Sequence, residues 1–213
     1  NLTIMDYAFY HFILPIPDHV DVMIRKLKSE AKRVIGNYPS MHARSHITIN
    51  NYPRKPLDVD VQGFSFLSRK LSLLPPVVFE TDGFDCFNES NDYNKTIFAR
   101  LKLTEQNKYW IKLLKGIVGD SSTIPHITIA RAITPEQFNL LWPYFQKREM
   151  KVKFVVNRLT ILKNLLLDLD QHAKTYREFE FRGDENVLTK YDNLAIARQI
   201  KNYPSINQQI SLF

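Results

Sequence analysis

The sequence contains a single cysteine, Cys86, in 213 residues. One cysteine excludes an internal disulfide, and it excludes a zinc site built from several cysteines. No H-E-x-x-H pair is present, and no glycine-rich loop ends in Lys-Ser or Lys-Thr. These absences disfavour zinc-dependent hydrolysis and ATP binding through a P-loop. We therefore expect a cytoplasmic protein that uses no cofactor and no metal.

Long hydrophobic runs are also missing. The segment from Tyr7 to Ile16 is apolar, but it contains His11 and no basic region precedes it. It is also too short to span a bilayer, which takes about 20 apolar residues. We interpret it as a buried strand, and we expect no membrane partner.

The composition favours a globular, basic protein. Hydrophobic residues make up 44% of the chain and aromatic residues 12%, while the formal net charge is +7 and the pI is near 9.4. A basic excess favours an anionic partner such as RNA or a phosphate, although many basic proteins bind no nucleic acid. The length fits one large domain or two small intertwined lobes, and we expect a monomer.

The tetrapeptide His-Ile-Thr-Ile occurs twice, at His46 to Ile49 and at His126 to Ile129. In a strand, alternate side chains point to opposite faces. Each copy therefore has an apolar side for a core and a side that carries one imidazole and one hydroxyl. Two such faces brought together would form a site.

The segments around the two copies follow the same order: strand, helix, motif strand, helix, strand. In the first half we expect a strand over residues 7–14, then a helix capped by Asp18 and ended by Gly36. After the motif we expect a loop over residues 50–56, a helix over 59–74 and a strand over 77–84.

In the second half we expect a half-buried strand over residues 96–103 and a helix that Thr104 caps and that ends near residue 118. After the motif, Thr134 and Gln137 predict the capping box of a helix over 135–146, which Pro143 should kink or shorten. Strands follow over 151–162 and 174–181. The repeated order indicates a duplicated half-domain with an approximate two-fold axis, over residues 1–183. Residues 184–213 form a polar extension with at most one short helix.

Two H-x-[ST]-hydrophobic motifs on strands, 80 residues apart, resemble the two-histidine (2H) phosphoesterase superfamily. This superfamily includes RNA 2′,3′-cyclic phosphodiesterases and the enzymes first described as 2′-5′ RNA ligases. The resemblance covers roughly residues 7 to 182, since the element order and the stretch from Pro125 to Arg131 are also similar to the family.

The resemblance implies a bilobal α/β (α+β) fold in which two antiparallel-type sheets face each other across a central cleft, with the helices outside. It also implies that His46, Thr48, His126 and Thr128 occupy the catalytic positions. The segments next to the first motif depart from the family, because Ser45 precedes it and Asn50 and Asn51 follow it, so the substrate is open.

Two imidazoles suit the cleavage of a cyclic phosphodiester. The reaction needs a base to take a proton from water and an acid to give one to the departing oxygen, and the imidazole pKa of about 6.5 allows both roles. The hydroxyls of Thr48 and Thr128 can donate to the charged phosphoryl oxygens. Which histidine is the acid and which is the base is open.

Four further residues are candidates for substrate binding. Arg44 would share a face with His46 if the strand began that early, but a solvated arginine is an equal alternative. Arg131 matches a basic residue of the resembled family, although strict alternation places it on the face opposite His126. His11 and Tyr7 share one face of the first strand, which contributes to the cleft in similar proteins.

We therefore predict a metal-independent phosphoesterase that hydrolyses a 2′,3′-cyclic phosphate or cleaves and joins 2′-5′-linked RNA. An RNA end or a nucleotide-like phosphate is the expected substrate. The first alternative is a non-catalytic RNA-binding or nucleotide-binding module on the same fold. The second is a structural protein whose repeat reflects duplication alone.

Overall fold

The computed structural model describes residues 7–56, 60–87, 94–119, 122–165 and 173–184. The predicted extension therefore lies outside the described residues from residue 185 onward. The elements, in chain order, are β1 (Tyr7–Pro15), α1 (Asp18–Ile35), β2 (His46–Pro56), α2 (Asp60–Leu71), β3 (Val77–Phe87), β4 (Lys95–Leu101), α3 (Glu105–Val118), β5 (His126–Ile133), α4 (Pro135–Gln146), β6 (Lys153–Val156), β7 (Arg158–Leu165) and β8 (Lys174–Glu180).

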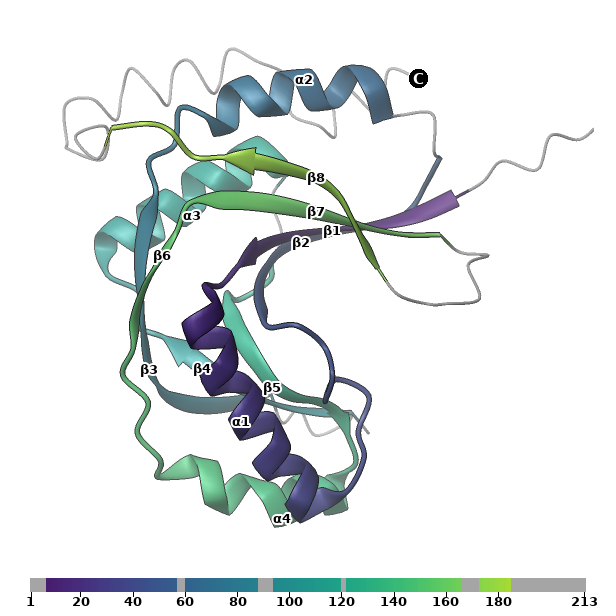
Figure 1. Ribbon diagram of the computed structural model, residues 1–213, viewed down its shortest axis with the longest axis vertical. Coiled ribbons are helices and arrows are strands. Elements are labelled where there is room, and N and C mark those ends of the chain that lie inside the picture. The colour runs from purple at the N-terminus through teal and green to yellow at the C-terminus, as the bar shows by residue number, and fades with distance from the viewer. Residues whose placement is uncertain (1–6, 57–59, 88–93, 120–121, 166–172, 185–213) are drawn as a thin grey trace, which may run out of the picture.

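The described strands form one curled antiparallel sheet of eight strands, in the order β6-β3-β4-β5-β2-β1-β7-β8 (Figure 1). The predicted α+β class is confirmed. Two separate sheets were predicted, and this detail is not observed, because β2 pairs with β5 through Ile47 and Ile127 and so joins the two halves. The two motif strands lie next to each other at the centre of the sheet.

In both halves of the chain, a strand that follows the motif crosses to the other half of the sheet. β3 follows the first motif but pairs with β4, while β7 follows the second motif and pairs with β1. The prediction of a single strand over residues 151–162 was wrong, because this segment forms two strands in different parts of the sheet. Asn157 separates β6, which pairs with β3, from β7, which pairs with β1 and β8.

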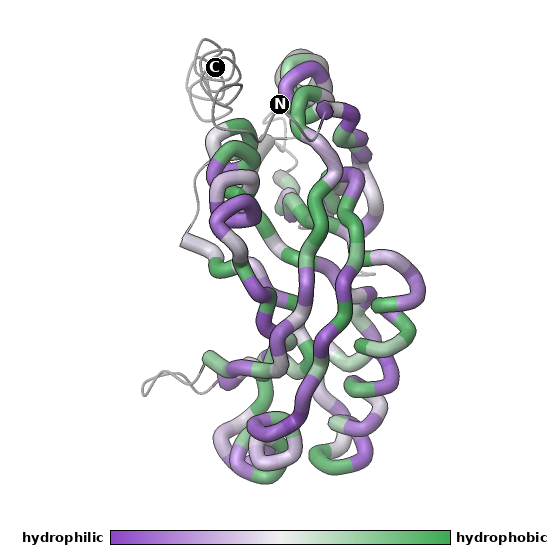
Figure 2. Tube along the Cα trace, turned by 90° about the vertical axis from the view of Figure 1, so that its left-hand side faces the viewer, coloured by the Kyte–Doolittle hydropathy of each residue, from purple (hydrophilic) through white to green (hydrophobic). Residues whose placement is uncertain are grey.

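The helices are exchanged in the same way. α1 precedes β2 but packs against β5 and α4, while α3 contacts β2 and α2 (Figure 1). Hydrophilic and hydrophobic residues alternate along the helical turns (Figure 2), as expected for helices that cover a sheet on one side. The buried helix residues include Ile24, Leu27, Trp110 and Leu114, which belong to one continuous core.

The helix ends follow the predicted capping pattern with one exception. Thr104 and Thr134 each accept a hydrogen bond from the third helical residue, in two complete capping boxes. Gly36 ends α1 with a φ of 75°, a conformation that glycine adopts without strain. The predicted cap at Asp18 was wrong, since the N-cap is Pro17. Asp18 lies in the first turn, where the negative charge of a carboxylate interacts favourably with the helix dipole.

Two other predicted elements change, while α4 keeps its predicted bounds. Residues 50–56 were predicted as a loop, but they continue β2, because they pair with β1 as far as Tyr7 opposite Pro56. Pro143 lies inside α4 without ending it. The strand predicted over 96–103 as half-buried is β4, in which only Arg100 is exposed. One of its faces contacts α4, and on the other Phe98 packs against Phe87 and His126. Within the described ranges, no helix combines the length and the apolar character that a membrane span requires.

Candidate active site

The pair of Ile47 and Ile127 sets the geometry of the motif strands. Both side chains are fully buried, while His46, Thr48, His126 and Thr128 are half-buried and lie on the other face of the sheet. Continuing the antiparallel register places His46 opposite Thr128 and Thr48 opposite His126. The two histidines are then diagonal neighbours, about 7–8 Å apart between backbones. The structure thus brings together the four predicted catalytic residues.

A β-bulge lies at the last residue of the motif in both strands, Ile49 in β2 and Ile129 in β5. The register shifts between Phe12 and Ile13 against β2, and between Ile97 and Phe98 against β5. A bulge adds one residue to a strand and so resets its alternation. Ile129 and the next residue are therefore both buried, and Arg131 is exposed on the side of the imidazoles. The prediction from strict alternation, which placed Arg131 on the opposite face, was wrong because of this bulge.

Each imidazole makes the same kind of hydrogen bond, from Nδ1 to a main-chain carbonyl. Nδ1 of His46 lies 2.9 Å from the carbonyl oxygen of Arg44, and Nδ1 of His126 lies 2.7 Å from the carbonyl oxygen of Ile124. A carbonyl only accepts, so Nδ1 carries the proton in each ring. The neutral imidazole therefore presents an unprotonated Nε2, which can accept a proton, and the imidazolium can return one from the same atom.

Burial lowers the pKa of the His46 imidazole below its usual value of 6.5, and the positive charges of Lys28, Arg131 and His11 lower this pKa further. The hydrogen bond to Arg44 acts in the opposite direction. The neutral, proton-accepting form of His46 is thus favoured near neutral pH.

The surroundings of His126 are different. Burial lowers the pKa of its imidazole, the hydrogen bond to Ile124 raises it, and Arg131 is the charged neighbour that lowers it. The ring also contacts Phe87 and Phe98, with centroid distances of 5.2 and 4.7 Å. Sequence reasoning missed both aromatic residues. Phe98 could have been found, because it alternates with core residues in β4 and so stands on the same side as Arg100.

The remaining three candidates for substrate binding lie on β1 and in the loop before β2. His11 is opposite Asn51, and its Nδ1 lies 2.8 Å from the Asn51 side-chain oxygen. Arg44 lies before the first residue of β2, and its guanidinium pairs with Asp18 at 2.7 Å. It therefore does not share a strand face with His46. Tyr7 stands at the outer end of β1, opposite Pro56.

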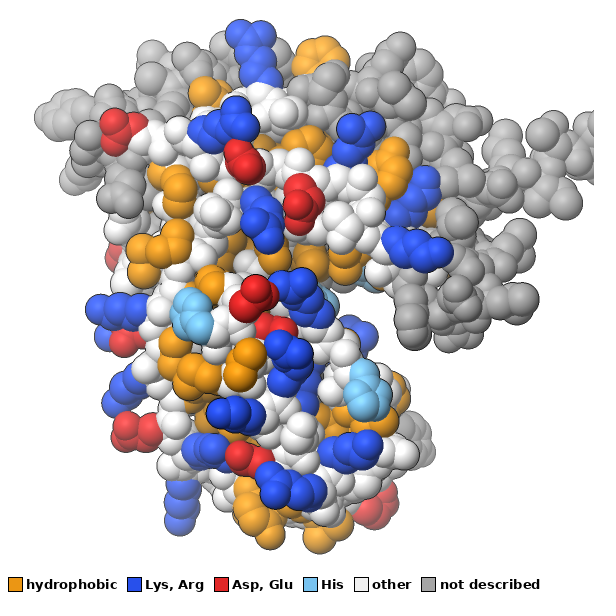
Figure 3. Space-filling model, viewed as in Figure 1, with side chains coloured by type: hydrophobic (Ala, Val, Ile, Leu, Met, Phe, Trp, Pro, Cys, Tyr) orange, Lys and Arg blue, Asp and Glu red, His pale blue; other side chains and the backbone are white. Residues whose placement is uncertain are grey.

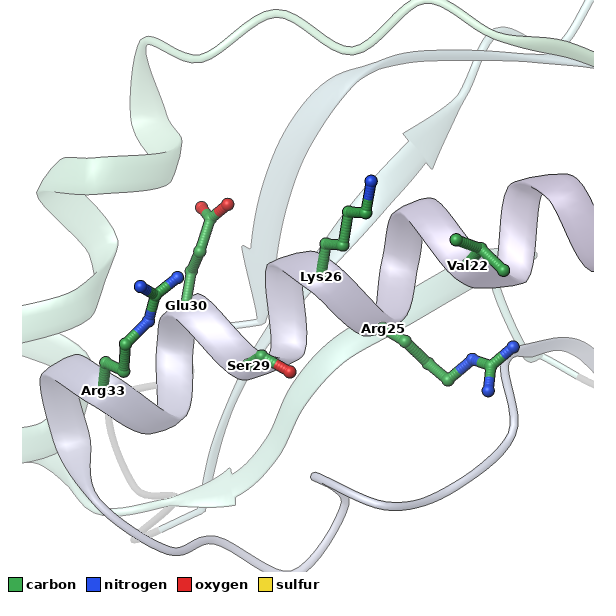
Figure 4. Close-up of a pocket in the computed structure, with 6 residues that line it drawn as sticks. All are labelled: Val22, Arg25, Lys26, Ser29, Glu30 and Arg33. Carbon is green, nitrogen blue, oxygen red and sulfur yellow. The ribbon is translucent and has the colours of Figure 1, made fainter.

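The outer surface shows two further features. The space-filling view is hollowed between the half that contains β7 and β8 and the half that contains α1 and α4 (Figure 3). A shallow depression on the exposed side of α1 (Figure 4) is lined by Val22, Arg25, Lys26, Ser29, Glu30 and Arg33. None of these side chains belongs to the motif strands. Among the described residues, no three His, Cys, Asp or Glu side chains gather in a way that could hold a metal ion.

No family model matches the sequence, and no curated protein sequence matches it. The structure is similar to the crystal structure of TT0787 of Thermus thermophilus, with a TM-score of 0.58 and 18% identity over 84% of this chain and 100% of that chain. It is also similar to E. coli LigT complexed with 3′-AMP, with a TM-score of 0.58 and 11% identity over 83% of this chain and 98% of LigT.

A further structure of LigT, with a TM-score of 0.54 and 10% identity over 83% of this chain and 99% of that chain, is a complex with NADP+. At these identities the likeness concerns the fold. The chain therefore has the fold of TT0787 and LigT.

Proposed function

We propose that the protein is a phosphoesterase of the two-histidine type, which hydrolyses a 2′,3′-cyclic phosphate or cleaves and joins 2′-5′-linked RNA. The observation that carries the proposal is the matched pair of imidazoles on adjacent strands. His46 and His126 share one face of the sheet, and each ring has its Nδ1 proton bound to a main-chain carbonyl. Each Nε2 is thereby left to exchange a proton with a substrate.

In the proposed hydrolysis, one Nε2 takes a proton from water while the oxygen of that water attacks phosphorus. The other imidazole, in its protonated form, gives its Nε2 proton to the departing sugar oxygen. One bond to phosphorus forms and one breaks. The two histidines then exchange protons with solvent, which restores their starting protonation states. In the joining reaction, the 5′-hydroxyl of a second RNA end takes the place of water: it gives its proton to one Nε2 and attacks phosphorus, and the departing sugar oxygen takes a proton from the other imidazole. Cleavage of the 2′-5′ linkage back to the cyclic phosphate is the reverse of this step, with the two roles swapped.

The charge of the phosphoryl oxygens needs donors on the same face. Thr48 and Thr128 each lie across from the histidine of the other motif, where a hydroxyl can donate to a phosphoryl oxygen held between the rings. We assign Arg131 to the phosphate as a charged donor, because its side chain is exposed on the side of the sheet that carries the imidazoles. His11, Tyr7 and Arg44 remain candidates for contacts with the rest of the substrate.

The substrate class is supported by the solved ligands of a protein with the same fold. Structures of E. coli LigT hold 3′-AMP and NADP+. The net charge of +7 is also favourable for a phosphate-bearing ligand. We therefore propose a nucleotide-like phosphate, at an RNA end or in a small nucleotide, as the substrate. The cytoplasmic location and the monomeric state stay predictions.

The experiment is a panel of 2′,3′-cyclic nucleotides, ADP-ribose cyclic phosphate and 2′-5′ oligoadenylate, assayed with a chelator present. We expect turnover of at least one compound by the wild type, and its loss in His46→Ala and in His126→Ala. The double variant should be no slower than either single variant, since the two residues act as one unit. Turnover by either single variant at the wild-type rate would reject the two-histidine mechanism.

The same panel separates catalysis from binding. A non-catalytic nucleotide-binding module predicts that wild type and His46→Ala bind the cyclic phosphate equally and that neither forms product. A structural protein predicts no phosphate affinity in either. Isothermal titration with a 2′-nucleotide product, run beside the assay, distinguishes these outcomes.

A further inference from the structure

The orientation of each imidazole depends on the loop that precedes its strand. The carbonyl that accepts the Nδ1 proton belongs to the residue two positions before the histidine, Arg44 in one half and Ile124 in the other. Neither carbonyl lies within a strand, because β2 begins at His46 and β5 begins at His126. The strand ladder therefore does not fix these two peptides. In the first loop, the N–H of the same peptide, on Ser45, donates to the Asp21 carboxylate at 3.0 Å, so Asp21 contributes to holding it.

A lysine from a helix holds the neighbouring carbonyl in each loop. Nζ of Lys28, on α1, donates to the carbonyl oxygen of Ala43 at 2.6 Å. Nζ of Lys115, on α3, donates to the carbonyl oxygen of Thr123 at 2.9 Å. Ala43 and Thr123 each stand three residues before the motif histidine. The two halves therefore share one arrangement, although the loop sequences differ.

We propose that Lys28 and Lys115 are positioning residues for the two histidines. Each ammonium fixes the peptide ahead of the motif, so that the next carbonyl along the loop meets Nδ1 of the imidazole and directs Nε2 toward the shared face. The catalytic consequence rests on the proposed function, whereas the effect on ring orientation does not. The lysines touch neither the substrate nor the reacting atoms in this scheme.

The burial of Lys28 supports a dedicated role. The residue is 3% exposed, and Nζ also lies 3.4 Å from the carbonyl oxygen of Ser40. Burial lowers the pKa of Lys28 to about 8, with Asp21 opposing the shift and Arg131 adding to it. Burying an ammonium costs free energy that an apolar side chain at this position would avoid.

The loop held by Lys28 is also tied to the other motif strand. The Ser40 hydroxyl accepts a hydrogen bond from the main-chain N–H of Arg131 at 2.9 Å. The Tyr38 hydroxyl lies within hydrogen-bond distance of the carbonyl oxygens of Lys28 and Ile129, at 3.1 and 3.3 Å. Displacing this loop would thus move His46 relative to the strand that carries His126, and not only rotate one ring.

The two lysines differ in charge coupling, which gives each a distinct signature. The charged groups that act on His46 are Lys28 of α1, Arg131 of β5 and His11 of β1, and all three lower its pKa. For His126, the charged group that lowers the pKa is Arg131. Removal of Lys115 releases the Ile124 carbonyl, whose hydrogen bond raises the pKa of His126, so this pKa should fall. Removal of Lys28 releases the Arg44 carbonyl and also removes a positive charge, and these two changes act on the pKa of His46 in opposite directions.

The test uses Lys28→Met and Lys115→Met, which keep the length of the side chain and remove the donor. Lys26→Met and Lys112→Met are the matched controls, because both lysines are exposed on the same two helices, and Lys26 lines the depression in Figure 4. Thermal melts verify that each variant is folded. The tautomer of each imidazole is read from its 15N chemical shifts above pH 7.5, and kcat and KM are measured from pH 5 to 9.

We expect the Nδ1–H tautomer of His46 to become mixed in Lys28→Met, and that of His126 to become mixed in Lys115→Met, with the other histidine unaffected in each case. We expect kcat to fall about 10- to 100-fold with KM within about threefold, as for a misplaced reacting group. The pKa of His126, read from a titration of its 15N shifts, should fall in Lys115→Met. The control variants should match the wild type.

An unchanged tautomer in a folded variant would overturn the proposal for that lysine. If Lys28→Met does not fold, Lys115→Met decides, because Lys115 is only half-buried. The tautomer measurement needs no substrate, so it tests the positioning role even if the panel of phosphates shows no turnover. If no compound of the panel is turned over but the tautomers still change in the lysine variants, the proposed function is rejected and the positioning role is retained.

Discussion

Ile47 lies directly opposite Ile127 in the register that joins β2 to β5. Because each isoleucine stands between the histidine and the threonine of its motif, this pair marks the centre of the duplication. Each histidine faces the threonine of the other motif across the two strands. The site is therefore assembled from both halves of the chain, and neither half contains a complete set of donors and acceptors.

The first prediction concerns the two threonines. Thr48→Val and Thr128→Val keep the β-branched shape that suits a strand and remove only the hydroxyl. Because the hydroxyls are assigned to the phosphoryl oxygens, we expect each variant to lower kcat about 100-fold and to change KM little. Steady-state kinetics measure both values. Thr175→Val, at an exposed position of β8, is the control, and equal kinetics of all three variants would refute the assignment.

The second prediction concerns Arg131. Since the guanidinium is assigned to the phosphate, Arg131→Gln should weaken binding of a 2′-nucleotide product about 10- to 100-fold, and it should reduce the dependence of binding on salt. Isothermal titration at two ionic strengths measures this change. Arg33→Gln removes the same charge from the exposed side of α1 (Figure 4). An equal loss of affinity in both variants would mean that only the net charge matters.

Local sequence patterns predicted much of this fold. The capping residues Thr104 and Thr134 fixed the starts of α3 and α4, and the repeat of His-Ile-Thr-Ile located both motif strands. These signals are readable because caps and alternation act over a few residues. The inference that one face of each motif strand is apolar agrees with the complete burial of Ile47 and Ile127.

The features that depend on distant pairing were not predicted. The bulge at Ile129 reversed the face of Arg131, and no local signal marks it. The break at Asn157 separates strands that pair with opposite ends of the sheet. The role of Lys28 was also missed, because a lysine on an amphipathic helix is ordinarily solvated, and only tertiary packing places it at 3% exposure against the loop.

The third prediction is a pH dependence of stability. The pKa of both His46 and His126 lies below 6.5 in the folded protein, so the unfolded chain binds more protons below this pH. Their contribution to stability is therefore complete above about pH 6.5, and it is lost as the pH falls from there through the folded-state pKa values. Urea unfolding at pH 7 and pH 5 measures the change.

The variant His46→Gln/His126→Gln should lose less stability than the wild type over this interval. The double variant His19→Gln/His42→Gln is the control, since both of these histidines are exposed. Lys28, whose pKa of about 8 lies below its usual 10.5, contributes at higher pH and does not interfere. Parallel curves for the wild type and the first double variant would contradict the lowered pKa values.

The fourth prediction concerns the backbone next to Arg131. Ala132 has a φ of 58°, in the left-handed region, and it is the extra residue where the register shifts between Thr96 opposite Arg131 and Lys95 opposite Ile133. A Cβ atom in this conformation costs about 1–2 kcal/mol, and glycine avoids that cost. Part of the gain is offset by the greater freedom of glycine in the unfolded chain.

We therefore expect Ala132→Gly to raise the free energy of unfolding by about 0.5–1 kcal/mol, as measured by urea unfolding at pH 7. Ala130→Gly is the opposite case, because Ala130 is fully buried in β5 and does not have a positive φ. There the lost methyl group and the added chain entropy should lower stability by about 1 kcal/mol or more. If both variants were destabilised equally, the conformation at Ala132 would carry no strain, and the bulge that follows Arg131 would be set by side-chain packing instead.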